Sequence, residues 1–127
     1  MKNLISISLI LVSSIFTASA QTRVAAKNAA KYTGRKVTIC DKVYGAKVEN
    51  GTTLLYLGGD YPKQLLTVMI KNGAQFKGKP DIEFKGKDIF VTGVVLNDKG
   101  KPGIAVTNSK QIREMLLDNP VKSTQGF

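Results

Sequence analysis

The chain has 127 residues, with 19 Lys and Arg against 9 Asp and Glu and a formal net charge of +10. It contains no histidine and a single cysteine, which removes the commonest general base and argues against a zinc site. The positive charge favours anionic partners such as nucleic acid, acidic glycans or anionic lipid, although lysines spread along a chain also serve solubility alone.

Residues 1–20 have the order of a secretory signal. Lys2 supplies a positive charge, an apolar stretch runs from Leu4 to Phe16, and small residues lead to Ala20. A spanning helix needs about 20 apolar residues, so the pattern predicts export and cleavage after Ala20 rather than a membrane anchor. Cleavage removes one charged residue and leaves 107 residues with net charge +9. We therefore expect an exported protein, periplasmic or secreted, with no membrane span after cleavage.

The remaining chain has the length of one domain. Residues 21–33 are alanine-rich and basic, which fits either a flexible leader or a short helix. Residues 34–117 carry the apolar runs of a folded domain, and residues 118–127 are expected to form a loose tail.

Five β-strands are expected in this domain. Runs rich in β-branched and apolar residues predict strands at Lys36–Val48, Thr52–Leu57, Leu65–Lys71, Asp88–Leu96 and Gly103–Thr107. Asn50-Gly51 favours a tight hairpin, because both residue types tolerate positive φ angles. Residues 97–102 predict a second hairpin. Gly45, inside the long first strand, indicates a bulge or a sharp bend.

Two segments between and after the strands have other patterns. Residues 72–87 are rich in glycine and include Pro80, which predicts an irregular connection with room for one helical turn. Ser109 is a candidate N-cap for a closing helix at residues 110–117, with Ile112, Met115 and Leu116 on one face.

The strand order favours a barrel. Five strands with two open edges are difficult to keep soluble, and a long first strand that bends at a glycine can pair on both sides of a small barrel. We therefore expect an all-β fold with short helices, namely the five-stranded, partly open Greek-key barrel called the OB-fold.

Five segments resemble OB-fold domains of the nucleic-acid-binding type, and one of them is Thr67–Ile70, which resembles their third strand. Gly34–Val43 resembles their GK-x-V-x-V-x-G-x-V opening, and Leu54–Pro62 resembles their second strand and loop. Gly86–Val95 resembles their GK-x-V-x-V-T-G-x-V fourth strand, and Lys101–Val106 resembles the fifth. The resemblance covers residues 34–112 and implies the same fold. It leaves the ligand open, because OB-folds bind many ligands.

Asp41 departs from this pattern, since the family has a glycine there. Either the bend moves to Gly45 or Asp41 lies in the bulge. Because a buried, unpaired carboxylate is costly, we expect Asp41 to be exposed or paired with a lysine.

The resemblance implies a ligand face around the second and third strands, framed by two loops. Single-stranded nucleic acid would need aromatic platforms and a basic track. The candidate platforms are Tyr44 and Tyr56, each of which can also be a core or rim ring. The candidate track, whose members can also be solvated surface charges, consists of Lys42, Lys47, Lys63, Lys71, Lys99 and Lys101.

Other side chains are assigned to structure. Cys40 lies in an apolar run, which predicts a buried thiol and leaves an intermolecular disulfide open. Phe76, Phe84 and Phe90 are expected in the core, and Tyr61 is expected to order its own loop.

A catalytic role has little support. The acidic residues are scattered, and Gly58-Gly59-Asp60 is not followed by the Gly-Lys-Ser/Thr of a phosphate-binding loop. We expect no catalytic residues, no metal and no cofactor. The leading hypothesis is a non-catalytic exported binding protein for an extended anionic ligand, most simply single-stranded nucleic acid. Export counts against nucleic acid. The alternatives are an envelope module that binds a glycan, peptide or protein, or a barrel edge that pairs with another chain.

Overall fold

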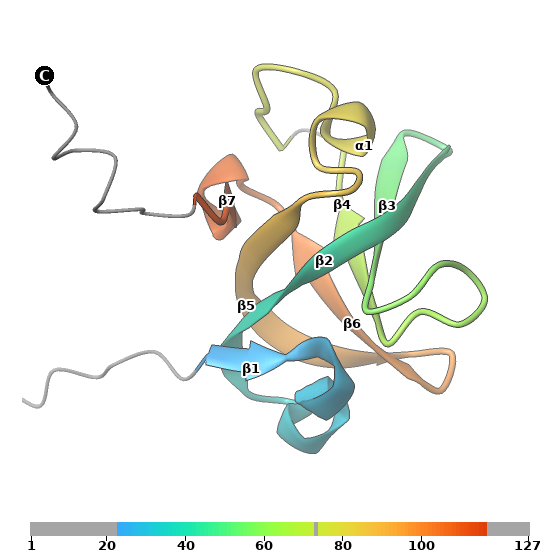
Figure 1. Ribbon diagram of the computed structural model, residues 1–127, viewed down its shortest axis with the longest axis vertical. Coiled ribbons are helices and arrows are strands. Elements are labelled where there is room, and N and C mark those ends of the chain that lie inside the picture. Colours follow the sequence, from blue (N-terminus) through green and yellow to red (C-terminus); the bar gives the residue numbers. More distant parts are fainter. Residues whose placement is uncertain (1–22, 73, 117–127) are drawn as a thin grey trace, which may run out of the picture.

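The computed structural model describes residues 23–72 and 74–116, so the predicted signal at 1–20 and the tail at 118–127 lie outside the described residues. The described chain is mostly β-strand, with short helical turns between strands (Figure 1). In chain order the elements are β1 (Arg23–Ala25), the 3-10 helix η1 (Ala26–Tyr32), β2 (Lys36–Glu49), β3 (Thr52–Leu57), β4 (Leu66–Ile70), α1 (Pro80–Glu83), β5 (Asp88–Asp98), β6 (Lys101–Val106), the 3-10 turn η2 (Ser109–Gln111) and β7 (Ile112–Glu114).

Five of the strands close a ring. They pair in the order β2-β3-β4-β6-β5, and β5 pairs again with β2. β4 and β6 are parallel, whereas every other pair in the ring is antiparallel. Two short strands extend the ring, β1 parallel to β2 and β7 antiparallel to β5. The expected OB-fold barrel is confirmed.

β2 serves both sides of the barrel because it bends. Its first half, up to Lys42, pairs with β5, and its second half, from Val43, pairs with β3. The register shifts between Val43 and Gly45, which makes Tyr44 the extra residue of a β-bulge. The bend therefore lies at Gly45, as one of the two sequence-based alternatives has it.

Both predicted hairpins are present. Asn50 and Gly51 have φ angles of 51° and 76°, and Lys99 and Gly100 have 51° and 86°. These left-handed conformations match the twist of tight hairpins. The strands differ from their predicted bounds by a few residues at most.

A single apolar core fills the barrel. Inward residues of all five ring strands are fully buried, including Ile39, Leu55, Val68, Val91 and Ile104. η1 adds Ala26 and Ala29 to this core, and Phe84, at the end of α1, also belongs to it. Figure 1 shows η1 and α1 at opposite ends of the barrel.

The expected closing helix at 110–117 is wrong within the described residues. Lys110 and Gln111 belong to the 3-10 turn η2, and Ile112–Glu114 form β7. Asn108, not Ser109, is the N-cap, in a capping box with Gln111. Gln111 Nε2 donates to the carbonyls of Thr92 in β5 and Ala105 in β6, and this holds the turn against both strands.

Two other expectations need correction. Phe90 is not in the core: it lies on the outer side of β5, with the guanidinium carbons of Arg23 and Arg113 at 4.9 and 4.8 Å from the ring centre. Asp41 is half-buried and accepts hydrogen bonds from the backbone N–H groups of Ala26 and Lys42, at 3.1 and 2.8 Å, instead of pairing with a lysine side chain.

Candidate nucleic-acid interface

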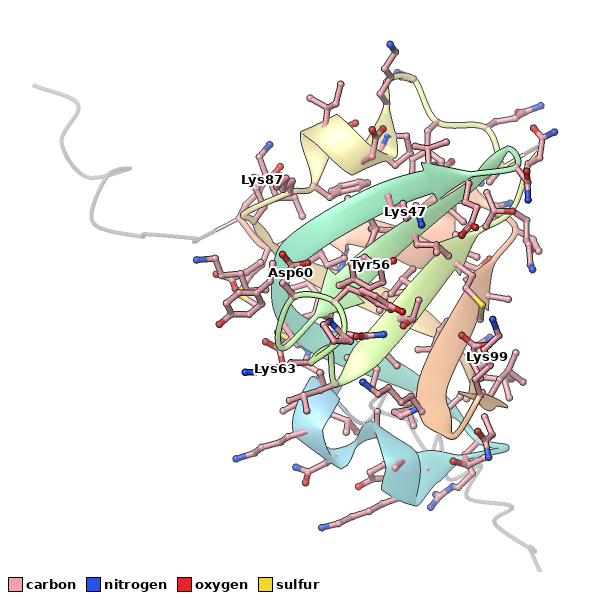
Figure 2. The ribbon with its side chains drawn as sticks, turned by 90° about the vertical axis from the view of Figure 1, so that its right-hand side faces the viewer. Lys47, Tyr56, Asp60, Lys63, Lys87 and Lys99 are labelled. Carbon is pink, nitrogen blue, oxygen red and sulfur yellow. The ribbon has the colours of Figure 1, made fainter. Side chains whose placement is uncertain are left out.

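The outer side of β2, β3, β4 and β6, together with the loop between β3 and β4, carries most of the predicted ligand residues. We call it the tyrosine–lysine face and define it by Lys42, Tyr44, Lys47, Tyr56, Tyr61, Lys63 and Lys101. Figure 2 shows Lys47, Tyr56 and Lys63 along this face, with Asp60 beside Tyr56 and Lys99 at the hairpin that follows β5.

The β3–β4 loop, residues 58–65, folds back onto this face. It is tied down at both ends, because Gly58 N donates to the Lys42 carbonyl at 3.2 Å and Leu65 N donates to the Leu57 carbonyl at 3.0 Å. Within the loop, Tyr61 N donates to Asp60 Oδ1 at 2.8 Å. The Tyr61–Pro62 bond is cis.

The absence of a side chain at Gly45 leaves space for this loop to pack against β2. A Cβ at Gly45 would lie 2.0 Å from Asp60 Oδ1, a distance that no side chain can occupy. The glycine of the β2 bulge therefore provides the space for the Asp60 carboxylate, which in turn binds the Tyr61 amide. The bulge and the loop form one unit.

The loop places Tyr61 over Tyr56. The ring centres are 5.6 Å apart with an interplanar angle of 41°, a tilted arrangement within the centre-to-centre range of about 4.5–7 Å that is usual for aromatic pairs. Tyr56 is only 6% exposed, whereas Tyr61 is 67% exposed. Burial, and then the neighbouring Tyr61, Glu49 and Asp60, raise the pKa of Tyr56. Tyr61 thus presents its ring to solvent, and Tyr56 supports it from below.

Tyr44 is the second exposed ring of this face. As the bulged residue of β2 it points outward and is 49% exposed. The Lys42 ammonium lies 5.5 Å from the centre of its ring, within the range of a cation–π contact. The structure therefore places one of the candidate rings next to one of the candidate lysines.

The lysines fall into distinct groups. Lys101 Nζ donates to the Pro62 carbonyl and so joins β6 to the β3–β4 loop. Lys47 makes a 3.8 Å ion pair with Glu49, but both side chains are exposed, so the pair contributes little. Lys63 lies in the loop, with its backbone N–H bound to the Asp60 carbonyl at 2.7 Å.

The remaining predicted lysines lie at the margins. Lys99 occupies the positive-φ position of the β5–β6 hairpin. Lys71 follows β4, where its backbone N–H donates to the Val106 carbonyl at 2.9 Å. The next residue, Asn72, lies beside the β2–β3 hairpin, because its Nδ2 is 3.5 Å from the position that a Cβ of Gly51 would take. These two lysines therefore frame the face from its two hairpin ends.

Gln64, in the β3–β4 loop, is a buried polar side chain whose hydrogen bonds are incomplete. Its side chain is buried and its Nε2 donates to Thr67 Oγ1 at 3.3 Å. Its Oε1 has no hydrogen-bond donor among the described residues. A buried acceptor without a donor costs about 1–3 kcal/mol, so Gln64 Oε1 lowers the stability of this region.

Metal-ligand clusters and membrane-spanning helices are both absent from the described part of the chain. Residues 23–72 and 74–116 contain no group of three or more His, Cys, Asp or Glu side chains placed to hold a metal ion. No helix in those ranges is long and apolar enough to cross a bilayer.

Comparisons with known proteins show the fold. No family model and no curated protein matches the chain. A putative aspartyl-tRNA synthetase from Leishmania major is similar at a TM-score of 0.50 and 12% identity, over 80% of this chain and 22% of the synthetase. The asparaginyl-tRNA synthetase from Pyrococcus horikoshii is similar at 0.50 and 13%, over 76% of this chain and 23% of that enzyme.

The chain therefore spans about a fifth of the length of those synthetases. The OBody AM1L10, solved bound to hen egg-white lysozyme, has a TM-score of 0.49 and 15% identity, over 75% of this chain and 93% of the OBody. Likeness at these identities shows the OB-fold alone.

Proposed function

We propose that the protein is a non-catalytic OB-fold binding protein for an extended anionic ligand, most simply single-stranded nucleic acid. The observation that carries the proposal is the exposed ring of Tyr61, supported from below by Tyr56 on a lysine-bearing face. Tyr44 provides a second exposed ring next to Lys42.

This arrangement suits a strand with alternating flat and charged parts. Stacking of a base on an aromatic ring is worth about 1–3 kcal/mol and tolerates any sequence. Lysines beside the rings neutralise phosphates, and the counterions that they release make the binding depend on salt. Two proteins of similar fold are named as tRNA synthetases, so the fold occurs in proteins that handle RNA.

We also propose that the protein is exported. This rests on the signal pattern of residues 1–20, which ends at Ala20. N-terminal sequencing of protein recovered from cells should give a chain that starts at Gln21. A chain that still starts at Met1 would contradict export without affecting the ligand proposal.

The ligand proposal is tested by two variants of equal net charge. One carries Lys42→Gln, Lys63→Gln and Lys101→Gln on the tyrosine–lysine face. The control carries three exposed substitutions elsewhere in the chain, namely Lys27→Gln, Lys31→Gln and Lys79→Gln. The probe is a fluorescent oligothymidylate of about 12 nucleotides, a length within the site sizes known for OB-folds.

Fluorescence anisotropy at low salt should show binding by the natural protein. The face variant should bind at least about tenfold more weakly, because three phosphate contacts are lost, while the control stays close to the natural protein. An equal loss in both variants would mean attraction by net charge alone. No binding at low salt would remove nucleic acid and favour a glycan, peptide or protein partner.

A further inference from the structure

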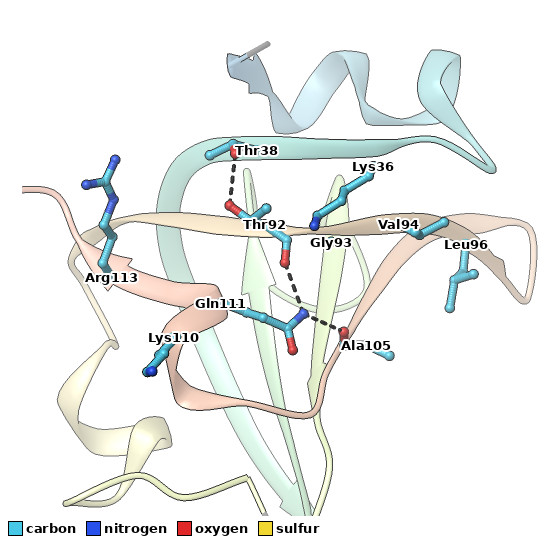
Figure 3. Close-up of a pocket in the computed structure, with 10 residues that line it drawn as sticks. All are labelled: Lys36, Thr38, Thr92, Gly93, Val94, Leu96, Ala105, Lys110, Gln111 and Arg113. Carbon is cyan, nitrogen blue, oxygen red and sulfur yellow. Dashed lines mark hydrogen bonds between the residues drawn. The ribbon is translucent and has the colours of Figure 1, made fainter. Parts of the chain in front are cut away.

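A second surface lies on another part of the barrel. The outer side of β2, β5 and β6, closed off by η2 and β7, surrounds a hollow of about 830 Å³ (Figure 3). We call it the β5 hollow. The lining residues that matter for its chemistry are Lys36, Val94, Leu96, Lys110, Gln111 and Arg113. None of them belongs to the tyrosine–lysine face.

The floor of the hollow is held by hydrogen bonds between strands. The hydroxyls of Thr38 and Thr92 are 2.8 Å apart. Gln111 Nε2 donates to the carbonyls of Thr92 and Ala105, at 3.0 and 3.3 Å, and so joins η2 to both β5 and β6. Gln111 Oε1 in turn accepts the N–H of Thr107 at 2.9 Å. The hollow is therefore preformed, as ligand sites usually are.

The hollow is lined by cations. Lys36, Lys110 and Arg113 line it, with Lys110 and Arg113 on one side and Lys36 nearer Val94 (Figure 3), and no carboxylate does. The ion pairs of the described residues involve none of these three cations. Arg113 also lies on the Phe90 ring, which Arg23 contacts as well. A guanidinium held in this way keeps its donors free for a carboxylate, phosphate or sulfate group.

Another part is apolar. Val94 and Leu96 alternate with the buried Val95 along β5, so both point outward, with exposures of 44% and 43%. Figure 3 shows these two side chains well away from Arg113 and Lys110. A ligand that satisfies both parts must carry an anionic group at one end and an apolar body at the other.

We propose that the β5 hollow binds a small amphipathic anion that is free in solution, with its carboxylate, phosphate or sulfate group toward Arg113 and Lys110 and its apolar body on Val94 and Leu96. Lys36 lies between these two parts (Figure 3). The volume falls within the range of small-molecule sites, about 300–1,000 Å³. The proposal does not depend on nucleic-acid binding, because it uses other strands and another ligand.

The probe is octanoate, followed by backbone amide NMR signals of the full chain. Octanoate should shift the signals of β5 residues 92–96 and of η2, and octyl phosphate should do the same. Acetate and 1-octanol should bind at least about tenfold more weakly, because each lacks either the apolar or the charged part. Octanoate shifts spread over the whole surface, or centred on Tyr61, would overturn the proposal.

Matched variants separate the two parts of the hollow. Arg113→Gln should weaken octanoate about tenfold and leave 1-octanol unchanged. The control is Arg35→Gln, because Arg35 also lies on an aromatic ring, Tyr32 at 5.4 Å, but outside the hollow. Val94→Thr should weaken both probes. Equal effects of the two arginine variants would overturn the proposal.

Two competitors test the source of the ligand. Oligothymidylate should not displace octanoate, and displacement would assign the hollow to the nucleic acid instead. Vesicles containing phosphatidylglycerol should leave the octanoate-shifted signals unperturbed. Vesicle binding through those same residues would assign the hollow to a membrane surface and contradict a free ligand.

Discussion

At the residue scale, we expect the two tyrosines of the β3–β4 region to have different roles. Tyr56 contributes mainly to stability and Tyr61 mainly to binding. Tyr56 alternates with buried residues along β3 yet is itself nearly buried, because the loop returns over it. The strand pattern predicts that Tyr56 points outward, but nothing in the sequence predicts that residues 58–65 fold back as a cover. The strand position of the platform was therefore predictable, and its exposed ring, Tyr61, was not.

Tyr61→Ala should weaken oligonucleotide binding about tenfold, since stacking on one ring is worth about 1–3 kcal/mol. It should change the free energy of unfolding by less than about 1 kcal/mol, because the ring is mostly exposed. Tyr56→Ala should instead destabilise the protein by about 3–5 kcal/mol, the usual cost of removing a buried aromatic ring. Anisotropy and urea unfolding measure the two effects, and Tyr61→Phe is the control that should keep both. A large loss of stability in Tyr61→Ala, together with a small one in Tyr56→Ala, would contradict these roles.

The outward position of Phe90 could have been predicted from the periodicity of its strand. In β5, residues 89, 91, 93 and 95 are buried and Asp88, Phe90, Thr92 and Val94 lie on the other side. Strict alternation therefore places Phe90 outside, next to a polar Asp88 and Thr92. The expectation of a core phenylalanine gave residue type more weight than periodicity, and the two arginines that cover the ring come from strands that are distant in the chain.

We expect the Cys40 thiol to be alkylated slowly at neutral pH in the folded protein. Burial raises its pKa above the ordinary value of 9.0, Asp41 and Asp88 raise it further, and Arg23 acts in the opposite direction. The pH dependence of iodoacetamide alkylation should therefore have a higher midpoint in the folded protein than in urea. Because the folded thiol keeps its proton to higher pH, its contribution to stability is present below the unfolded pKa and is lost as pH rises through the folded one. A folded midpoint at or below the unfolded one would contradict this.

At the element scale, the five strands of the barrel were predictable, whereas β1 and β7 were not. β-branched runs and the Asn-Gly signal place β2 to β6 within a few residues. The segment after β6 has helical spacing in Ile112, Met115 and Leu116, but the free edge of β5 takes Ile112–Glu114 as a strand. Backbone pairing with a strand far away in sequence overrides a local pattern.

We expect the Gln111 side chain to stabilise the packing of η2 and β7 against the barrel. Its amide contacts β5, β6 and the turn before η2 through five hydrogen bonds. Gln111→Ala should lower the free energy of unfolding by about 2–3 kcal/mol, because it leaves several backbone groups without partners. Lys110→Ala, at the neighbouring exposed position, is the control and should have little effect. Chemical denaturation measures both, and similar stabilities would contradict the role of Gln111.

The β2 bulge and the β3–β4 loop should be energetically coupled. Gly45→Ala should destabilise the protein by about 1 kcal/mol, the usual net worth of a hydrogen bond, because the new Cβ displaces the Asp60 carboxylate and the Tyr61 N–H loses its acceptor. Asp60→Ala removes the atoms that clash, so the double variant should be more stable than the sum of the single effects predicts. A double-mutant cycle by urea unfolding tests this. Strict additivity would mean that Gly45 and Asp60 act independently.

At the scale of the whole molecule, the barrel separates two kinds of positively charged surface. The tyrosine–lysine face combines exposed rings with lysines from two strands and a loop. The β5 hollow combines fewer cations with exposed aliphatic side chains. The net charge of +10 is visible in the sequence, but its division between these surfaces depends on barrel closure. Composition alone therefore predicts an anionic ligand and not its location.

The central claim is that the tyrosine–lysine face binds single-stranded nucleic acid through its lysines. The most direct measurement is the affinity for oligothymidylate as a function of salt, for the natural protein and for the variant with Lys42, Lys63 and Lys101 changed to glutamine. The account predicts a linear fall of log K with log salt, with a slope of about −0.7 for each phosphate neutralised, and a shallower slope for the variant. Identical slopes for the two proteins, or no binding at low salt, would contradict it.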